Sequence, residues 1–223
     1  MKSLVETIQM LKNVPNSIYF DLKYKFNYHS NKIEGSTFSL ENILNLMQYD
    51  KVDGNHSFDD VMETKNSLEL FDFVIDTLGE KISKTLLFEF HSILKKNTKD
   101  DQYGFKGCYK KIPNMILGTN TKVAQPYEVE ALIDNIIKLY YDLNLVTIRD
   151  IAEFHIKFEI IHPFQDGNGR IGRFIILKQC IENSIDPILI TEDNIFEYRK
   201  SINSIDDLSS FFEKCERYKI SGL

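Results

Sequence analysis

The chain has 223 residues, of which 43% are hydrophobic, and this length and composition suit one globular domain with a sizeable core, alone or with an appendage. Its formal net charge of −6 at pH 7 argues against a general nucleic-acid-binding surface and against binding to anionic membranes. The three cysteines are scattered and no stretch is apolar enough for a signal core or a membrane span, so we expect a cytoplasmic protein with reduced thiols and neither a disulfide framework nor a zinc site.

Apolar residues at helical spacing predict a mainly α-helical fold. In the first half of the chain we expect helices over residues 1–12 and 17–33. Three serines that precede further periodic runs are expected to cap the next three helices, and these are Ser39, Ser57 and Ser83. Polar breaks and loops join these helices.

Residues 100–126 differ from the rest, because glycine and proline recur there between short apolar pieces. We interpret them as an irregular segment with a β-hairpin at residues 111–123, whose turn falls at residues 118–120. Further helices are expected from about residue 127, over residues 147–161, after residue 170, and over residues 193–201 and 204–218. The helix after residue 170 is strongly apolar, which is typical of a central, buried helix.

The most informative stretch is residues 162–173, with the sequence HPFQDGNGRIGR. Pro163 cannot continue a helix, so the preceding helix should end at His162 and leave the imidazole facing a loop. Phe164 is the expected plug that ties this loop to the core. Residues 167–169, Gly-Asn-Gly, tolerate positive φ and can turn successive backbone N–H groups toward one anion.

Charged residues flank this glycine-rich turn. A new helix is expected to begin near Arg170, and its N-terminus adds positive potential at the same point. Arg170 and Arg173 are three residues apart and share one helix face, where guanidinium groups can bind phosphate oxygens. Asp166 offers hard oxygen ligands for a magnesium ion that also touches phosphates. The stretch is therefore typical of a polyphosphate-binding site with a histidine at its edge.

Residues 162–173 resemble the signature of the Fic family, His-Pro-Phe-x-Asp/Glu-Gly-Asn-Gly-Arg-x-x-Arg, at every fixed position. Members of that family mostly transfer AMP from ATP to a hydroxyl group of a target protein, with a divalent metal such as Mg²⁺ or Mn²⁺. The resemblance implies that His162 is the general base and that Asp166 holds the metal. The phosphate-binding residues that it implies are Gly167, Asn168, Gly169, Arg170 and, for the γ-phosphate, Arg173. The implied fold is the Fic-type helical bundle, with the hairpin as a flap beside the active site.

A second Fic element, the inhibitory motif Ser/Thr-x-x-x-Glu-Gly/Asn, is matched by Ser30, Glu34 and Gly35. Its position before the core is that of family members with an N-terminal inhibitory helix. Ser30 and Glu34 are four residues apart and share a helix face, so the Glu34 carboxylate can pair with Arg173 in the place of the γ-phosphate. The alternative is a helix end capped by Gly35 with a solvated Glu34.

Residues 107–114 resemble the approach to the Fic flap, although Lys110 stands where many members have arginine. By analogy, the hairpin would bind an extended target segment by strand addition, and the residues that would dock it are Ile112, Met115 and Ile116. The alternative is a hairpin that only covers the core.

Two further residues remain as candidates. His155 lies seven residues before His162, and two helical turns separate such side chains by roughly 10 Å, so we interpret His155 as a structural residue and not as a metal ligand. Tyr198 is a candidate for the adenine pocket because of its place after the central helix.

We therefore expect a protein adenylyltransferase that uses ATP, is autoinhibited by Glu34 against Arg173, and modifies a Ser, Thr or Tyr hydroxyl of a target protein, itself included. Residues 1–55 are expected to hold the N-terminal helices with the inhibitory helix, and residues 56–223 the Fic core, in one globular unit. A homo-oligomer stays open.

Other functions stay open as well. The nearest are related transfers, namely removal of AMP, transfer of UMP, or phosphorylation in an inverted pose, and Gly167 argues against the last. A non-catalytic nucleotide-binding regulator is disfavoured by the intact His162 and Asp166, since neither is needed merely to bind. A DNA-binding regulator is disfavoured by the acidic charge balance.

Overall fold

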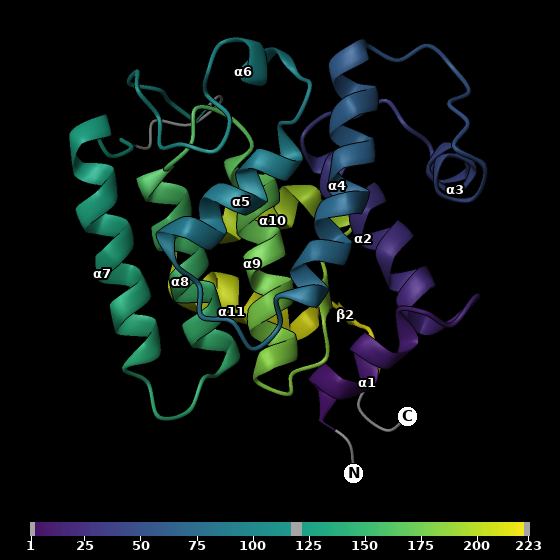
Figure 1. Ribbon diagram of the computed structural model, residues 1–223. Coiled ribbons are helices and arrows are strands. Elements are labelled where there is room, and N and C mark those ends of the chain that lie inside the picture. The colour runs from purple at the N-terminus through teal and green to yellow at the C-terminus, as the bar shows by residue number, and fades with distance from the viewer. Residues whose placement is uncertain (1–2, 117–121, 221–223) are drawn as a thin grey trace.

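The computed structural model describes residues 3–116 and 122–220, and helices make up most of them (Figure 1). In chain order, the elements are α1 (Leu4–Leu11), α2 (Ile18–Ile33), α3 (Leu40–Tyr49), α4 (Phe58–Asp76), α5 (Lys84–Leu94), α6 (Lys99–Gln102), η1 (Pro126–Glu128), α7 (Val129–Tyr141), α8 (Ile148–Ile161), α9 (Asn168–Glu182), β1 (Ile188–Leu189), η2 (Glu192–Asn194), α10 (Ile195–Ser201), α11 (Ile205–Lys214) and β2 (Glu216–Arg217). None of the described helices is long and apolar enough to cross a membrane. The predicted mainly α-helical fold is confirmed.

Six of the described helices begin where a hydroxyl side chain caps them, and α3, α4, α5 and α8 are among these six. The side-chain oxygens of Ser39, Ser57, Ser83 and Thr147 each accept a hydrogen bond from the backbone N–H three residues later. Such a bond satisfies one of the N–H groups that lack a partner in the first helical turn. The starts of α3, α4, α5 and α8 thus follow from local sequence.

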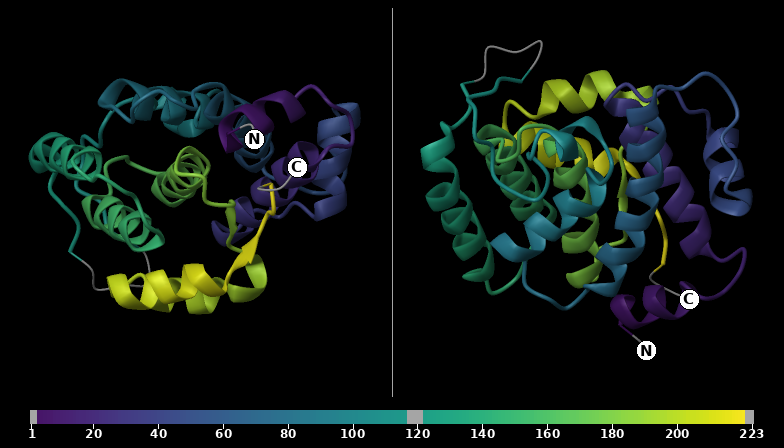
Figure 2. Two further views of the ribbon diagram at one scale, coloured as in Figure 1. Left: turned by 90° about the horizontal axis from the view of Figure 1, so that it is seen from below. Right: turned by 45° about the horizontal axis from the view of Figure 1, so that its top comes forward.

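Helix α9 is the centre of the fold. Seen from below, in the left view of Figure 2, the other helices surround it. Its apolar residues are fully buried, Ile171, Phe174 and Leu177 among them. Because α9 is buried on nearly all sides, it has no single apolar face of the kind that a surface helix shows. The prediction of a central, buried helix after residue 170 is confirmed.

The sheet lies away from the predicted hairpin. Among the described residues the only strands are β1 and β2, which pair antiparallel with Ile188 opposite Arg217. Residues 111–116 and 122–123 form no strand, so the prediction of strands there is wrong for these residues, and the predicted turn at residues 118–120 lies outside the described residues. The physical reason is that residues 111–116 bond to another loop: the Ile112 N–H donates to Gln165 Oε1 at 3.4 Å, and the Asn114 side chain donates to the Phe164 carbonyl at 2.9 Å.

One additional helix and two helix ends also differ from the prediction. Helix α6 lies within the segment expected to be irregular, and α11 ends at Lys214 because Glu216 and Arg217 enter β2. Helix α9 begins at Asn168, two residues before Arg170, because Gly167 takes φ +80° and acts as its N-cap.

Phe164 fixes the loop between α8 and α9. It is fully buried, and its ring stacks on His91 of α5 with 4.1 Å between ring centroids. The Asn168 side chain holds the Phe164 backbone from both sides, accepting from its N–H at 2.8 Å and donating to its carbonyl at 2.9 Å. Phe164 is therefore the plug that the sequence predicted, and the Asn168 amide is committed to the loop itself.

The buried position of Phe164 predicts a large loss of stability when the ring is removed. Phe164→Ala should lower the free energy of unfolding by about 3–5 kcal/mol, because it removes a buried ring and leaves a cavity. Urea denaturation measures this change. The matched control is Phe196→Ala, since Phe196 is 73% exposed, and its effect should stay within about 0.5 kcal/mol. Equal losses for the two variants would contradict the role of Phe164.

Candidate functional site

His162 ends α8 in a left-handed conformation, with φ 51°. Few residues with a side chain adopt this conformation. The backbone N–H of His162 still donates to the Phe158 carbonyl at 2.9 Å, which is the last helical hydrogen bond, and the chain then turns toward Pro163. The His162 side chain is 16% exposed. Burial, and after it the charge of Lys110, lowers the pKa of His162 to about 4. The imidazole is therefore neutral at pH 7 and can accept a proton.

The first turn of α9 lies against a carboxylate. Gly167 caps it, and the next glycine, Gly169, lies under the carboxylate of Glu34, because a Cβ at Gly169 would collide with Glu34 Oε1. Backbone N–H groups at a helix start lack intrahelical partners, and the helix dipole favours a negative charge there. The Gly-Asn-Gly turn therefore already lies next to an anion, the carboxylate of Glu34.

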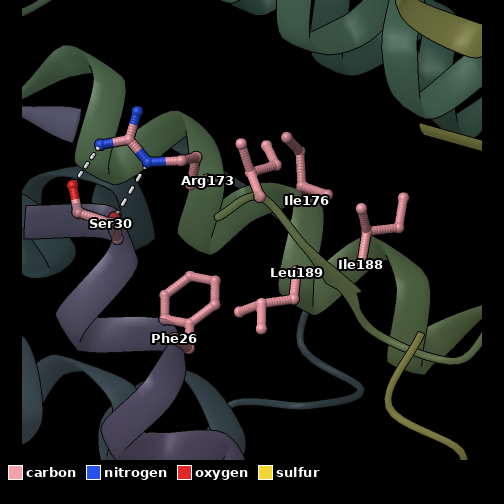
Figure 3. A pocket seen from close by; sticks show the side chains of 7 residues that line it. Phe26, Ser30, Arg173, Ile176, Ile188 and Leu189 are labelled. Atoms are coloured by element: carbon pink, nitrogen blue, oxygen red, sulfur yellow. Dashed lines mark hydrogen bonds between the residues drawn. The ribbon is translucent and has the colours of Figure 1, made fainter. Parts of the chain in front are cut away.

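Arg173 holds Glu34 in this place. Its guanidinium donates to Glu34 Oε1 at 2.7 Å, to the Ser30 carbonyl at 2.9 Å and to Ser30 Oγ at 2.9 Å. Figure 3 shows the contact with Ser30. The cavity beside it, which Phe26 also lines, measures only about 10 Å³ and has room for no more than one water. Three residues that belong to two separate sequence motifs are thus brought together.

The charge of Glu34 depends on this contact. Burial alone would raise its pKa, but the charges of Arg173 and Arg170 outweigh burial and hold the pKa of Glu34 below its ordinary value. Gly35 follows α2 with φ +91°, and its N–H donates to the Lys32 carbonyl at 2.9 Å. Gly35 is therefore the predicted helix cap, but Glu34 is paired and not simply solvated.

Asp166 belongs to a cluster of charges at the ends of several helices. The buried ammonium of Lys95 pairs with Asp166 Oδ2, with Glu63 Oε1 at 2.6 Å and with Asp100 Oδ2 at 2.9 Å. Arg170 pairs with Glu63 and lies 3.5 Å from Asp166 Oδ2. Partial loss of water around its carboxylate would raise the pKa of Asp166, but the charges of Lys95 and Arg170 outweigh this effect and hold the pKa well below its usual range.

This cluster fits a metal only at Asp166. One oxygen from each of Glu63, Asp100 and Asp166 lies within 4.8 Å of the others, but the ammonium of Lys95 already lies among them and neutralises their charge. The Asp166 side chain is 61% exposed and can offer an oxygen toward solvent. Mg²⁺ beside phosphates needs only one or two carboxylates, with phosphate oxygens and water as its other ligands.

His91 positions the loop that carries Asp166. The N–H of Gly107 donates to Nδ1 of His91 at 3.0 Å, so the ring proton is on Nε2, which lies 3.1 Å from the Asp166 carbonyl and donates to it. Burial, and after it the charge of Lys95, lowers the pKa of His91 to about 3 and keeps the ring neutral.

Glu159 on α8 is a buried carboxyl group between two histidines. Its Oε1 lies 4.0 Å from His155 Nε2, and its Oε2 lies 3.9 Å from His162 Nδ1. Burial, reinforced by the negative charge of Glu34, raises the pKa of Glu159 to about 7, although Arg173 opposes the shift.

Three residues of the site were not predicted from the sequence, namely Glu63, Lys95 and Glu159. Glu63 and Lys95 belong to no motif and reach the site from α4 and α5, so no local pattern links them to residues 162–173. Glu159 lies one helical turn before His162, and this spacing on a shared helix face could have identified it.

His155 and Tyr198 form a buried pair, with 2.7 Å between Nε2 and the phenol oxygen. His155 is therefore the structural residue that the sequence predicted. Tyr198, the candidate for the adenine pocket, has a side chain that is 2% exposed and packs inside the core.

The residues expected to dock a target lie at the surface beside the loop that follows α8. Ile112 is 54% and Met115 is 72% exposed, and Ile116 is partly exposed. Asn114 between them donates to the Phe164 carbonyl at 2.9 Å. A groove of about 610 Å³ is lined by residues 122–136, which follow this segment in sequence, and by the C-terminal part of α8.

Comparison with known proteins gives one family. Residues 81–180 match the model of the Fic/DOC family. The chain is 31% identical over 111 residues to probable protein adenylyltransferase aq_aa38 of Aquifex aeolicus, a match that covers 49% of this chain and 33% of that protein. It is 26% identical over 193 residues to protein adenylyltransferase fic-1 of Caenorhabditis elegans, covering 82% of this chain and 37% of that protein. The chain thus spans about a third of the length of these curated relatives.

Solved structures share the fold. A Fic domain containing signaling protein from Bacteroides thetaiotaomicron superposes with a TM-score of 0.81 at 22% identity, covering 95% of this chain and 90% of that one. Fic-1 from C. elegans, residues 134–508, gives a TM-score of 0.76 at 19% identity, covering 97% of this chain and 68% of that one.

The carboxyl of Glu159 gives a testable pH dependence of stability. Its pKa is about 7 when folded against an ordinary value of 4.5, so the folded state binds this proton more tightly. The stabilising contribution is complete below about pH 4.5 and is lost as the pH rises through about 7. Relative to wild type, Glu159→Gln should therefore gain about 2–3 kcal/mol of unfolding free energy between pH 5 and pH 8.

Denaturant titrations at the two pH values measure this difference. The control is Glu153→Gln, which removes a carboxylate of the same helix that pairs with Lys157 at 2.6 Å near the surface. The difference in unfolding free energy between the control variant and wild type should change little between the two pH values. If the difference between Glu159→Gln and wild type is also constant with pH, Glu159 titrates normally.

Proposed function

We propose that this chain is a protein adenylyltransferase of the Fic family, whose model matches residues 81–180. It moves AMP from ATP to a Ser, Thr or Tyr hydroxyl of a target protein, itself included, and releases pyrophosphate. The observation that carries the proposal is a neutral imidazole, His162, close in the chain to an anion site flanked by Arg170 and Arg173. Relatives named protein adenylyltransferase support it.

The chemical step is an in-line substitution at the α-phosphorus. A bond forms between the target hydroxyl oxygen and the α-phosphorus, and the bond from that phosphorus to the bridging oxygen of pyrophosphate breaks. The hydroxyl proton passes to the imidazole of His162, which its lowered pKa of about 4 keeps unprotonated. A base placed in this way contributes roughly 10²–10⁴-fold to the rate.

The start of α9 binds the phosphates. Backbone N–H groups of Gly167, Asn168 and Gly169 and the helix dipole favour negative charge there, and Arg170 and Arg173 add two fixed positive charges. Asp166 would hold Mg²⁺ or Mn²⁺, and the ion, when bound, neutralises charge on the phosphate oxygens. The Asn168 side chain takes no part in this binding, because it holds the loop.

Glu34 inhibits the transfer by its pairing with Arg173. The carboxylate lies over Gly169 and uses an N–H of Arg173, so the γ-phosphate loses its cation and meets a negative charge instead. ATP then binds with its α-phosphorus out of line, and such misalignment is costly because in-line geometry supplies much of the catalysis.

The target protein binds beside the loop that follows α8. The exposed side chains of Ile112 and Met115 and the partly exposed Ile116 contact an extended target segment. Because Asn114 bonds to the Phe164 carbonyl, that segment is brought near His162. The free cysteines among the described residues suit the reducing cytoplasm as the site of the reaction.

The proposal predicts that label is transferred from the α-phosphate of ATP and not from the γ-phosphate. The protein is incubated with α-labelled or γ-labelled ATP, magnesium and a cell extract, and labelled proteins are resolved on a gel. Label from α-labelled ATP alone is the expected result, and His162→Ala should abolish it while nucleotide affinity stays within a few-fold. Label from γ-labelled ATP would mean kinase chemistry, and no protein label from either would contradict group transfer.

Removal of the inhibitory carboxylate should raise the rate. Glu34→Gly is expected to incorporate AMP at least about tenfold faster than wild type, since the γ-phosphate regains Arg173 and productive alignment. Initial rates of AMP incorporation, self-modification included, measure the change.

The double variant Glu34→Gly with Arg173→Ala is the control. It removes the inhibitory carboxylate and the cation for the γ-phosphate together, so it should stay well below Glu34→Gly. A Glu34→Gly rate equal to that of wild type would show that the contact has no inhibitory role.

A further inference from the structure

Beneath His162 lies a buried contact that the proposed reaction does not yet use. The Nδ1 atom of His162 and the Oε1 atom of Glu159 are both buried, and neither has a hydrogen-bond partner among the described residues. The other carboxyl oxygen, Oε2, lies 3.9 Å from His162 Nδ1. Buried polar atoms without partners are rare in native proteins, and each one needs an explanation.

Gly172 of α9 leaves space for this carboxyl group. A Cβ at Gly172 would come within 2.9 Å of Glu159 Oε1 and within 2.8 Å of the His155 ring, so a larger residue there would displace one of the two side chains. The titratable and charged groups that face the carboxyl group are His155 and His162 of α8, Glu34 of α2, Arg173 of α9 and Tyr198 of α10.

We propose that Glu159 is a positioning residue for His162: its carboxylate accepts a hydrogen bond from Nδ1–H and thereby presents the Nε2 lone pair to the target hydroxyl. The backbone carbonyl of Glu159 also faces His162 and favours a proton on the ring. The separation of 3.9 Å is longer than a hydrogen bond, and hydrogen bonds in active sites are often long until substrate binds. This inference rests on the proposed role of His162 as the base.

The carboxylate also compensates the charge that forms during transfer. When Nε2 takes the hydroxyl proton, His162 becomes an imidazolium with protons on both nitrogens, and the new ester bond to the α-phosphorus forms as pyrophosphate leaves. A negative Glu159 beside Nδ1 stabilises this cation, which is how a buried carboxylate assists a histidine base in hydrolases. Nε2 then releases its proton to solvent.

His162 and Glu159 differ in the pH at which they titrate. The pKa of His162 is lowered to about 4 and that of Glu159 is raised to about 7, so the group that changes charge near neutral pH is the carboxyl group. The rate should therefore rise with pH through about 7 as Glu159 loses its proton. The charge of Glu34 contributes to the raised pKa of Glu159, so the rise should begin at lower pH when Glu34 is replaced.

The test compares kcat, KM for ATP and the pH profile of kcat/KM in three proteins. Each carries Glu34→Gly so that transfer is fast enough to measure, and they are this background alone, with Glu159→Gln, and with the control Glu153→Gln. Glu159→Gln should lower kcat about 10- to 100-fold, a share of the total effect of the base, with KM unchanged within twofold. The rise in kcat/KM with pH should persist in the control and be absent with Glu159→Gln. If KM changes together with kcat in Glu159→Gln, or if its pH profile matches that of the background protein, the proposal is overturned.

A second measurement needs neither activity nor a substitution. In wild-type protein with ¹⁵N-labelled histidine, the ring nitrogens of His162 should shift near pH 7 although His162 itself stays neutral, because they respond to Glu159. His162 signals without a step in that range would overturn the coupling, whether or not AMP transfer occurs. If the step is present and transfer is absent, the contact stands and the proposed function fails.

Discussion

The pairing of Arg173 with Ser30 and Glu34 is the interaction on which the rest of the site depends. Arg173 is 3% exposed, and a buried guanidinium without an anion would cost several kcal/mol. Its partners come from α2, at the far end of the chain from α9 in sequence, so this contact joins the two helices. A cation that must always have an anionic partner can exchange a carboxylate for a phosphate, and this exchange is the physical basis of the proposed inhibition.

A second set of charges forms ion pairs beside the first turn of α9. Lys95, Glu63, Arg170 and Asp166 neutralise one another at the ends of separate helices. Helix α9 can be central because its cations are paired and because small residues let anions approach it: Gly169 lies against Glu34, and Gly172 lies against Glu159. The two glycines therefore matter for the space that they leave open.

How much the sequence could predict follows from how local each feature is. The caps and the end of α8 before Pro163 depend on neighbouring residues, and they were predicted correctly. The burial of Phe164 was also predicted, although the ring packs on the distant residue His91. The partners of Lys95, the pairing of β1 with β2 and the burial of Tyr198 depend on segments far apart in the chain, and no local pattern contains them. The Arg173–Glu34 pair is also distant in sequence, and it was anticipated only because a family motif links the two residues.

The proposed inhibition requires that Glu34 occupies the place of the γ-phosphate at Arg173. Calorimetric titration of the protein with ATP and with ADP, each with magnesium, measures this competition, because the two nucleotides differ only in that phosphate. In wild type the two affinities should be nearly equal, and in Glu34→Gly the affinity for ATP should exceed that for ADP by at least about tenfold, as expected for a charge-assisted contact. The same ratio of affinities in both proteins would show that Glu34 does not compete with the γ-phosphate.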